Sequence, residues 1–343
     1  MLLHFYCWDK FRVENSYSSH LYPFFSDLLR RCYGNFYFSI GDLIYGLLAC
    51  WIIWRMAKAV RSIFVQPDKI TTSIARGILN LLNVMMMVYL LFNFCWGINY
   101  DRKGIAWQTG IEMKEYDSMD LKKINELLLE KVNQSKMSCS INTLTIVSDQ
   151  DVFKKAIAAY QKSADTFSFL KFNHIAVKPS LWGWLGNYLG YTGYYNPFTG
   201  EAQVNTTIPP FTQPFIVCHE MAHQLGYAKE SEANFVAYLV SKYSDDEALK
   251  YSTYLELFFY ANRNLYEYDS TSAIHYRDKL NSLVKQDIKT IIAFNLAHKN
   301  NIEPLITWAY DLFLKSNQQP KGMLSYNQVT AFLINYYRKF GYI

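Results

Sequence analysis

The chain has 343 residues, of which 51% are hydrophobic, so it can bury a sizeable core, and this composition argues against a largely disordered protein. The net charge is only +5 and the basic residues form no long run, which argues against a nucleic-acid-binding protein. The six cysteines form no CxxC pair and no regular spacing, so the sequence indicates no disulfide scaffold.

The first predicted element lies between Val13 and Cys32. It reads VENSYSSHLYPFFSDLLRRC, and its mixture of aromatic, aliphatic and charged residues predicts a short amphipathic piece on a membrane surface. The residues before it, MLLHFYCW, are too few to span a bilayer and lack the charged start of a secretory signal. We expect them to be the end of a longer apolar helix that is missing from this chain.

Two apolar stretches follow, each about as long as a helix that crosses a hydrocarbon core of about 30 Å. They are FYFSIGDLIYGLLACWIIW at 36–54 and GILNLLNVMMMVYLLFNFCWGI at 77–98. Asp42 interrupts the first stretch, but it lies near one end, where it can reach the interface, and the second stretch carries no charge. The sequence therefore predicts a membrane anchor over residues 1–98, with a pair of buried helices in a soluble protein as the alternative.

The segment between these stretches carries five basic residues and one acidic residue, namely Arg55, Lys58, Arg61, Lys69, Arg76 and Asp68. The positive-inside rule places such a segment in the cytoplasm, so both flanks would lie outside. Basic residues near the outer ends weaken this bias: Arg30, Arg31, Arg102 and Lys103. We expect residues 99–343 to form an extracytoplasmic domain.

The remainder of the chain predicts an α+β domain that is mainly helical. Apolar spacing predicts helices at 120–132 and 150–163, β-branched runs predict strands at 141–148 and 172–179, and a loop at 180–214 surrounds a short strand at 201–205. After residue 215 helical periodicity dominates almost to the end. We therefore expect a small sheet followed by a helical C-terminal part.

The sequence HEMAH places His219 and His223 four residues apart, so on a helix both imidazoles face the same side and can bind one metal ion. Zinc in hydrolytic sites takes three protein ligands and leaves one position for water. Glu220 lies beside the histidines and is the candidate general base. The alternative is a helix whose histidines make ordinary hydrogen bonds.

The third zinc ligand is expected from the following helix, because Gly226 can end the first helix and let the chain turn back. Lys229 stands where HExxHxxGxxH proteases place a third histidine, so that pattern fails. Glu230 and Asn234 share a helix face, which favours Glu230 as the ligand and Asn234 as a hydrogen-bond partner of a ligating histidine. Glu232 remains the alternative ligand.

The chain resembles a family of bacterial membrane proteins catalogued as domain of unknown function 3810. The resemblance rests on FSIGDLIY in the first apolar stretch, GYYNPFTGEAQVN from Gly193, HEMAHQLGYAKESEANFVAYL from His219, and GMLSYNQV near the end. It implies N-terminal transmembrane helices followed by a zincin-like, gluzincin-like metallopeptidase domain, with His219, His223 and a following glutamate at Zn²⁺. It also implies a multi-pass protein of the bacterial cytoplasmic (inner) membrane.

Several further residues are candidates for substrate binding and packing. In peptidases of this design an extended peptide pairs with an edge strand, so the strand at 201–205 is the candidate, and a strand that only supports the helix is the alternative. The possible donors to an oxyanion are Tyr194, Tyr195, Tyr227, His275 and Tyr326. We expect Cys218 and the aromatic stripes at 258–268 and 305–314 to pack in the core.

The sequence favours a membrane-anchored zinc metallopeptidase that hydrolyses peptide or protein substrates with Glu220 as the base. A non-catalytic membrane sensor or scaffold with a structural zinc is one alternative. A zinc amidase that acts on cell-envelope material is another. The expected partners are a substrate peptide and the lipid bilayer, with no nucleic acid.

Overall fold

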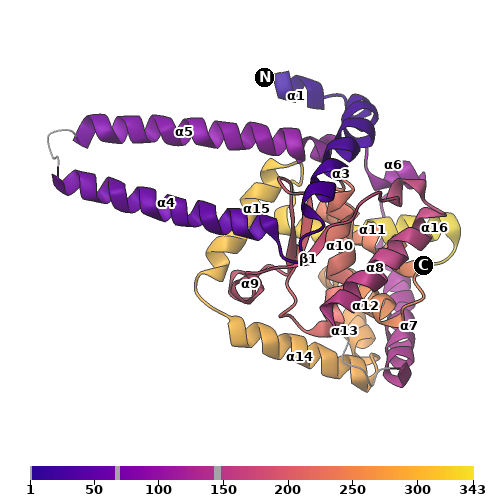
Figure 1. The fold of residues 1–343 in the computed structure, drawn as a ribbon. Helices are drawn as coiled ribbons and strands as arrows, with labels where there is room; N and C mark the ends of the chain where they lie inside the picture. The colour runs from indigo at the N-terminus through magenta and orange to yellow at the C-terminus, as the bar shows by residue number, and fades with distance from the viewer. Residues whose placement is uncertain (1, 66–69, 143–147) are drawn as a thin grey trace.

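The computed structural model describes residues 2–65, 70–142 and 148–343. The fold is mainly helical and contains one small sheet, as the sequence predicts. Two long helices extend together from one end of a helical body (Figure 1). None of the six cysteines, all of which lie within the described residues, forms a disulfide bond.

The two long helices are α4 (Ile40–Val65) and α5 (Ile70–Cys95), and they correspond to the two apolar stretches. Their segments Ile40–Arg61 and Gly77–Cys95 are long and apolar enough to cross a membrane. Almost none of either segment is buried inside the protein, which is the opposite of what a core helix shows. The two predicted apolar helices are therefore present, although α4 begins four residues after the predicted start.

The N-terminal segment forms a chain of short helices: α1 (Leu2–Cys7), α2 (Lys10–Arg12), the π-helix η1 (Val13–Leu21) and α3 (Tyr22–Tyr33). The predicted amphipathic character is present, but the buried face contacts protein. Tyr17 and Tyr22 pack in one cluster with Trp96 and Tyr100, which follow the end of α5. Residues 13–33 therefore contact the folded body directly.

The sheet has three short strands in the order β1-β3-β2: β1 (Val177–Pro179), β2 (Gly193–Asn196) and β3 (Glu201–Val204). β1 runs parallel to β3 and β2 runs antiparallel to it. The strands predicted at 172–179 and 201–205 are present in shortened form. The predicted strand at 141–148 falls largely on 143–147, which lie outside the described residues, and its first two residues end helix α7.

The prediction that the strand at 201–205 forms a sheet edge is wrong. β3 is the central strand, because β1 and β2 occupy both of its sides. The edge strand on the side of helix α10 (Gln213–Gln224) is therefore β2, although the sequence predicts a loop for the residues of β2.

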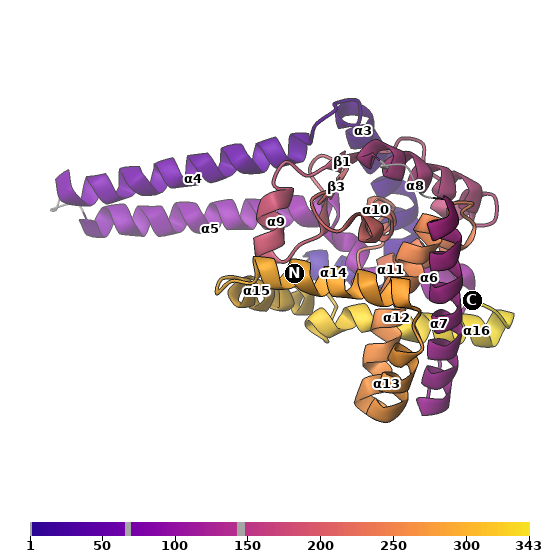
Figure 2. The same cartoon turned by 90° about the horizontal axis from the view of Figure 1, so that it is seen from below.

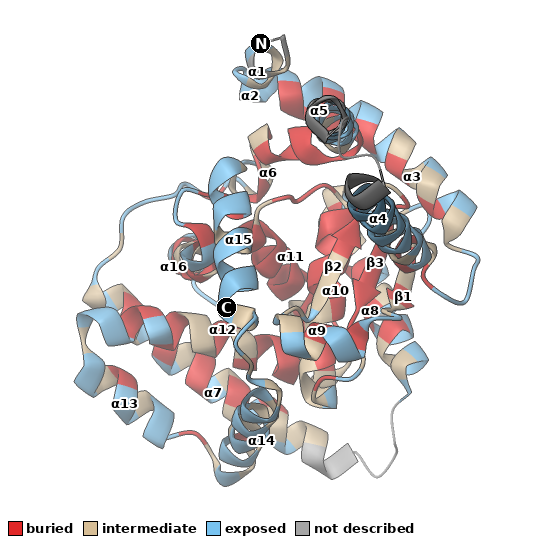
Figure 3. Cartoon of the chain, turned by 90° about the vertical axis from the view of Figure 1, so that its left-hand side faces the viewer, coloured by how far each residue is buried: buried red, intermediate tan, exposed pale blue. Residues whose placement is uncertain are grey.

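The helical body surrounds two central helices, α10 (Gln213–Gln224) and α11 (Glu230–Lys242), which are buried over nearly their whole length (Figure 3). Around them lie α6 (Ile105–Thr109), α7 (Ser118–Asn142), α8 (Asp149–Ala164), α12 (Glu247–Tyr268) and α16 (Val329–Phe340). α7 and α8 confirm the helices predicted at 120–132 and 150–163. The remaining elements are α9 (Gly183–Leu189), α13 (Ser270–Asp278), α14 (Ser282–His298), α15 (Glu303–Ser316) and the 3₁₀ helices η3 (Gly97–Asp101), η4 (Ser168–Leu170), η5 (Pro210–Thr212) and η6 (Gly322–Gln328).

The two aromatic stripes that the sequence predicts to pack in the core, at 258–268 and 305–314, differ in how far they are buried. In the first stripe, on α12, Phe258 and Leu265 are fully buried, as predicted, but Tyr266 and Tyr268 at its end are exposed, so the prediction holds only in part. In the second stripe, on α15, Trp308 is 59% exposed, so the prediction that this stripe packs in the core is wrong. α15 lies at the outside of the body (Figure 2), and its residues Leu305, Trp308 and Leu312 are exposed.

Candidate metal centre

Helix α10 carries the HExxH residues and lies between the sheet and the helices α8, α11 and α12. Pro214 occupies its first turn, where a missing N–H costs nothing. Gly226 follows the helix with a positive φ of 82°, which lets the chain reverse and enter α11. The predicted turn at Gly226 is therefore present, and it places the start of α11 against the histidine face of α10.

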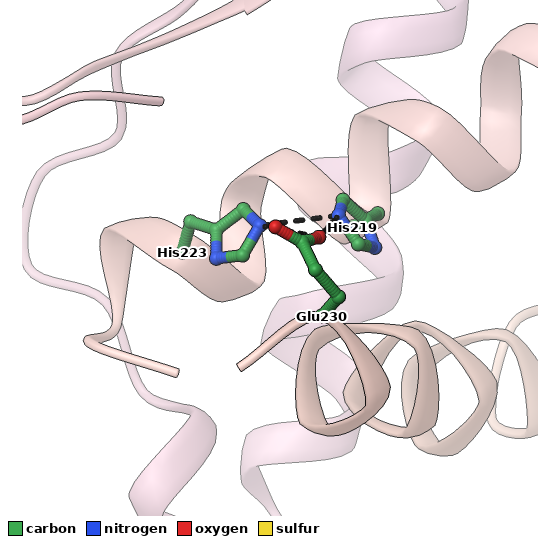
Figure 4. A group of neighbouring side chains, drawn as sticks. All are labelled: His219, His223 and Glu230. Carbon is green, nitrogen blue, oxygen red and sulfur yellow. Dashed lines mark hydrogen bonds and ion pairs between the residues drawn. The ribbon is translucent and has the colours of Figure 1, made fainter. Parts of the chain in front are cut away.

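This turn brings His219, His223 and Glu230 together, as the sequence predicts (Figure 4). The distance between Nε2 of His219 and Oε2 of Glu230 is 3.1 Å, and that between Nε2 of His223 and the same oxygen is 3.5 Å. The two Nε2 atoms lie 3.1 Å apart. All three side chains are buried, so the cluster is a preformed group of potential metal ligands.

Both imidazoles are held by hydrogen bonds on the opposite side of the ring. Nδ1 of His219 lies 2.7 Å from Oδ1 of Asn234, as expected for the predicted partner of a ligating histidine. Nδ1 of His223 lies 2.6 Å from the carbonyl oxygen of Tyr227. Because both partners are acceptors, each Nδ1 donates its proton and each Nε2 is left to face the cluster.

Glu230 receives a further hydrogen bond that the sequence analysis missed. The hydroxyl of Tyr310 on α15 donates to Oε1 of Glu230 at 2.9 Å, and the hydroxyl of Tyr326 lies 3.4 Å from that of Tyr310. The sequence offered no signal for this contact, since Tyr310 lies 80 positions after Glu230 and in a different helix.

The alternative ligand, Glu232, points away from the cluster. Its carboxylate lies against Gly104, and Nζ of Lys229 lies 3.7 Å from its Oε1. The two glutamates are two positions apart on α11, so they project from different faces of the helix. The structure therefore brings Glu230, and not Glu232, next to the histidines.

The charges of His223 and Glu230 shift each other's pKa. Burial alone would lower the pKa of His223, but the adjacent Glu230 carboxylate raises it to about 9. The pKa of Glu230 is lowered, because the attraction and hydrogen bonds of the two histidines outweigh the effect of burial. The two pKa values shift in opposite directions, as expected for an imidazole and a carboxylate that attract one another.

The side chain of Glu220 projects from a different face of α10 than the two histidines and lies beside strand β2. Burial raises its pKa to about 7, and its Oε2 has no hydrogen-bond partner among the described residues. A Cβ atom at Gly193 of β2 would lie only 2.8 Å from Oε1 of Glu220, so this strand position requires glycine. A buried carboxylate with a pKa near neutrality and an unused oxygen is suited to accept a proton.

Four of the five predicted oxyanion donors lie elsewhere or are already engaged. The hydroxyl of Tyr194 bonds to Asp42, that of Tyr195 lies 3.2 Å from that of Tyr22, that of Tyr227 bonds to Gln108, and His275 lies exposed on α13. Only the Tyr326 ring lies beside the cluster, stacked with the His219 ring at a centroid distance of 6.4 Å.

The C-terminal end of α10 is held by residues from the N-terminal part of the chain. Tyr22 and Arg30 of α3 donate to the carbonyl oxygen of Gln224, both at 3.0 Å. Nε1 of Trp96 donates to the carbonyl oxygen of His223 at 3.2 Å, and Arg102 donates to those of Leu225 and Gly226. These donors satisfy carbonyl groups that a helix end leaves unpaired, and the cations favour the negative end of the helix dipole.

The donor set fits zinc. With metal–ligand bonds of about 2.0–2.1 Å in a tetrahedral arrangement, ligand atoms are about 3.4 Å apart. The three pairwise distances of 3.1, 3.1 and 3.5 Å in the cluster are close to this value. Two imidazoles and one carboxylate also match the ligand types of hydrolytic zinc sites, in which a fourth position remains open.

A family model described as a protein of unknown function (DUF3810) matches residues 17–334. No curated protein and no solved structure shows significant similarity to the chain.

Proposed function

Since the chain belongs to the DUF3810 family, whose description names no activity, we propose a function from its own residues: a membrane-anchored, zinc-dependent metallopeptidase. The observation that carries the proposal is the meeting of His219, His223 and Glu230, with their potential ligand atoms all within 4.8 Å of one another. The zincin-like character of the domain is part of this proposal.

In this proposal His219, His223 and Glu230 hold the zinc ion, and Asn234 and the Tyr227 carbonyl keep the imidazoles in the binding orientation. Bound zinc supplies Lewis-acid activation of water and of the scissile carbonyl. Glu220 accepts the proton of the attacking water on its free Oε2 and then delivers it to the leaving amine.

The position of β2 supports a peptide as the substrate. β2 is an edge strand, and Gly193 places its backbone directly against Glu220. An extended peptide that pairs with this edge would bring a backbone amide close to the proposed base. Tyr326, whose ring stacks on His219, is the candidate donor of a hydrogen bond to the oxyanion.

A structural zinc in a sensor or scaffold is less well supported. Structural zinc sites are closed by four protein ligands, whereas the cluster of potential ligands among the described residues has three members. A structural site also gives no reason for a buried Glu220 with an unused oxygen beside it.

We also propose that α4 and α5 span the bacterial cytoplasmic membrane and that the body of the protein lies on its extracytoplasmic side. The exposure of both apolar segments supports the spanning helices, and the basic residues between them support the orientation. A cytoplasm-active reporter fused after Ile343 should remain inactive.

The test of the activity compares the full-length protein with Glu220→Gln in detergent. The wild type should cleave a mixed library of quenched peptides, and Glu220→Gln should lose about 10²–10⁴-fold in rate while it retains its zinc, because the base is removed and the ligands are not. An unchanged rate would exclude Glu220 as the base. Cleavage of envelope fragments instead of peptides would favour the amidase.

A further inference from the structure

The outer surface of the body carries apolar side chains at the end from which α4 and α5 emerge. α9 and α15 lie at this end in all three views (Figures 1–3). We call the exposed side chains here the apolar belt, which comprises Trp182 directly before α9, Trp184 and Tyr188 of α9, and Leu305, Trp308 and Leu312 of α15. Between 37% and 61% of each side chain is exposed, and none carries a charge.

On α15, the apolar belt is the outer face of a helix whose opposite face packs against the protein. On α15, Leu305, Trp308 and Leu312 follow a helical spacing on the outside. On the inside, Tyr310 bonds to Glu230 and Leu314 is fully buried. The orientation of α15 is therefore fixed by contacts with the candidate metal centre, so its apolar outer face is not a consequence of a loosely placed helix.

The belt lies level with the proposed membrane spans. The indole N–H of Trp182 donates to the carbonyl oxygen of Asp42 at 3.2 Å, and a Cβ on Gly46 would lie 3.1 Å from the Trp182 ring. Gly46 is about 9 Å along α4 from Ile40, the first residue of the span. On the other helix, the ring of Phe92 lies 6.1 Å from that of Phe313 on α15, and Phe92 is inside the span that ends at Cys95.

Asp42 supports this placement. The sequence predicts that the carboxylate of Asp42 reaches the interface, and this prediction is wrong. Asp42 is fully buried and accepts hydrogen bonds from the backbone N–H of Leu181, the hydroxyl of Ser180 and the hydroxyl of Tyr194. The loop that enters α9 thus covers the carboxylate inside the first turn of the span. Protein at this level, with an apolar outer surface, is what a lipid environment requires.

We propose that the apolar belt lies in the interfacial layer of the lipid bilayer. Tryptophan and tyrosine are enriched in that layer, where an apolar ring and a polar N–H or O–H are both accommodated. A contiguous exposed patch of this kind is unusual on a water-facing surface and marks an interaction site. The apolar belt lies next to α4 and α5, which are proposed to be surrounded by lipid. We therefore infer that lipid, and not a second copy of the chain or a peptide, covers the belt.

The inference rests on the proposed membrane anchoring and is independent of the proposed hydrolysis. If it holds, only the thickness of α15 separates the candidate metal centre from lipid, since Tyr310 contacts Glu230 from that helix. The width of one helix is about 10 Å.

The test is tryptophan quenching in vesicles made with lipids brominated near the headgroup end of the acyl chain. Full-length protein is reconstituted as wild type and as single Trp→Phe variants, and the emission lost with each variant reports that residue. Trp184 and Trp308 should be strongly quenched. Trp107, which is similarly exposed but lies on α6 away from the spans, should not be.

Trp51, about 16 Å along α4 from Ile40 and therefore near the bilayer midplane, separates this inference from the proposed anchoring when it is measured in parallel vesicles whose lipids are brominated near the end of the acyl chain. Quenched Trp51 with unquenched Trp184 and Trp308 would overturn the inference and leave the anchoring intact, and a dimer by mass photometry would then identify a second copy as the occupant. Unquenched Trp51 would overturn both. Since the variants change exposed rings to phenylalanine, folding should be unaffected.

Discussion

At the scale of single residues, the candidate site depends on which atoms already have partners. The two Nδ1 atoms of His219 and His223 are engaged, and the Nε2 atoms converge on Glu230. Oε2 of Glu220 lacks a partner among the described residues. A buried carboxylate oxygen without a partner destabilises a fold, so Oε2 of Glu220 beside the group of potential ligands argues for a chemical role of this side chain.

A substitution at Gly193 tests the position of Glu220 without changing any proposed ligand. In Gly193→Ala the added methyl group would meet Oε1 of Glu220 at 2.8 Å and the carbonyl oxygen of Gln203 at 2.9 Å, so the carboxylate or the strand must move. We expect zinc to be retained and hydrolysis to fall about 10²-fold, since a displacement of about 1 Å has this effect.

The control for this variant is Gly77→Ala on α5, where an added Cβ would contact no atom within 4 Å. Both variants are assayed with the same peptide library and for bound zinc. Equal activity of Gly193→Ala and wild type would show that Glu220 does not act from its observed position.

The residues of the site were predictable to different extents. The HExxH spacing and the Glu230–Asn234 pair are local helical patterns, so sequence alone predicted which side chains meet. Tyr310 was not predictable, because it reaches Glu230 from a helix 80 positions away. Whether Glu230 or Glu232 faces the histidines depended on where α11 begins, which the turn at Gly226 decides.

At the scale of elements, α10 is supported by α3, which belongs to the N-terminal segment. Arg30 is 4% exposed and bonds to the carbonyl oxygens of Gln224 and His174. Periodicity predicted that this segment is amphipathic, but periodicity cannot tell whether an apolar face contacts lipid or protein. The order of the strands was unpredictable for a related reason, since strand pairing depends on distant parts of the chain.

Arg30→Met should destabilise the protein by about 1.5–3 kcal/mol, because buried carbonyl groups lose a charged hydrogen-bond donor. The adjacent Arg31 is exposed and makes no such contact with the residues that the structure describes, so Arg31→Met is the matched control and should change stability by less than about 0.5 kcal/mol. Thermal unfolding of both full-length variants in detergent measures the difference. Equal unfolding temperatures would contradict the capping role of α3.

At the scale of the whole molecule, the proposed anchor and the site form one connected structure. The buried pair of Arg102 and Glu14, with Nη2 and Oε1 2.7 Å apart, joins the N-terminal segment to the loop after α5. Arg102 also reaches the end of α10. The division of the chain into a membrane anchor (1–98) and a catalytic domain (99–343) remains a prediction. The contacts of Arg102 join residues on both sides of this boundary.

This ion pair predicts a dependence of stability on pH. Burial alone would raise the pKa of Glu14, but the hydrogen bonds and charge of Arg102 hold it below its usual value of 4.5. Because the unfolded chain takes up the proton first, the stabilisation is fully present above the unfolded pKa and is lost as the pH falls below it toward the folded pKa. Thermal unfolding between neutral and acidic pH measures this loss.

Glu14→Gln should remove this contribution to the acid dependence and lower stability at neutral pH by about 3–5 kcal/mol, since Arg102 is left buried without its counter-charge. Glu126→Gln is the control, because Glu126 forms an exposed pair with Lys123. Parallel pH profiles for wild type and Glu14→Gln would show that the pair does not couple the segment to the body.

The most direct measurement of the central claim is the zinc content of the purified full-length protein, determined together for wild type, Glu230→Gln and Glu232→Gln. The structure places Glu230 in the cluster and Glu232 outside it. We predict about one zinc ion per chain in wild type and in Glu232→Gln, and a large loss in Glu230→Gln. A wild-type protein without zinc, or zinc that is lost only with Glu232→Gln, would contradict the account.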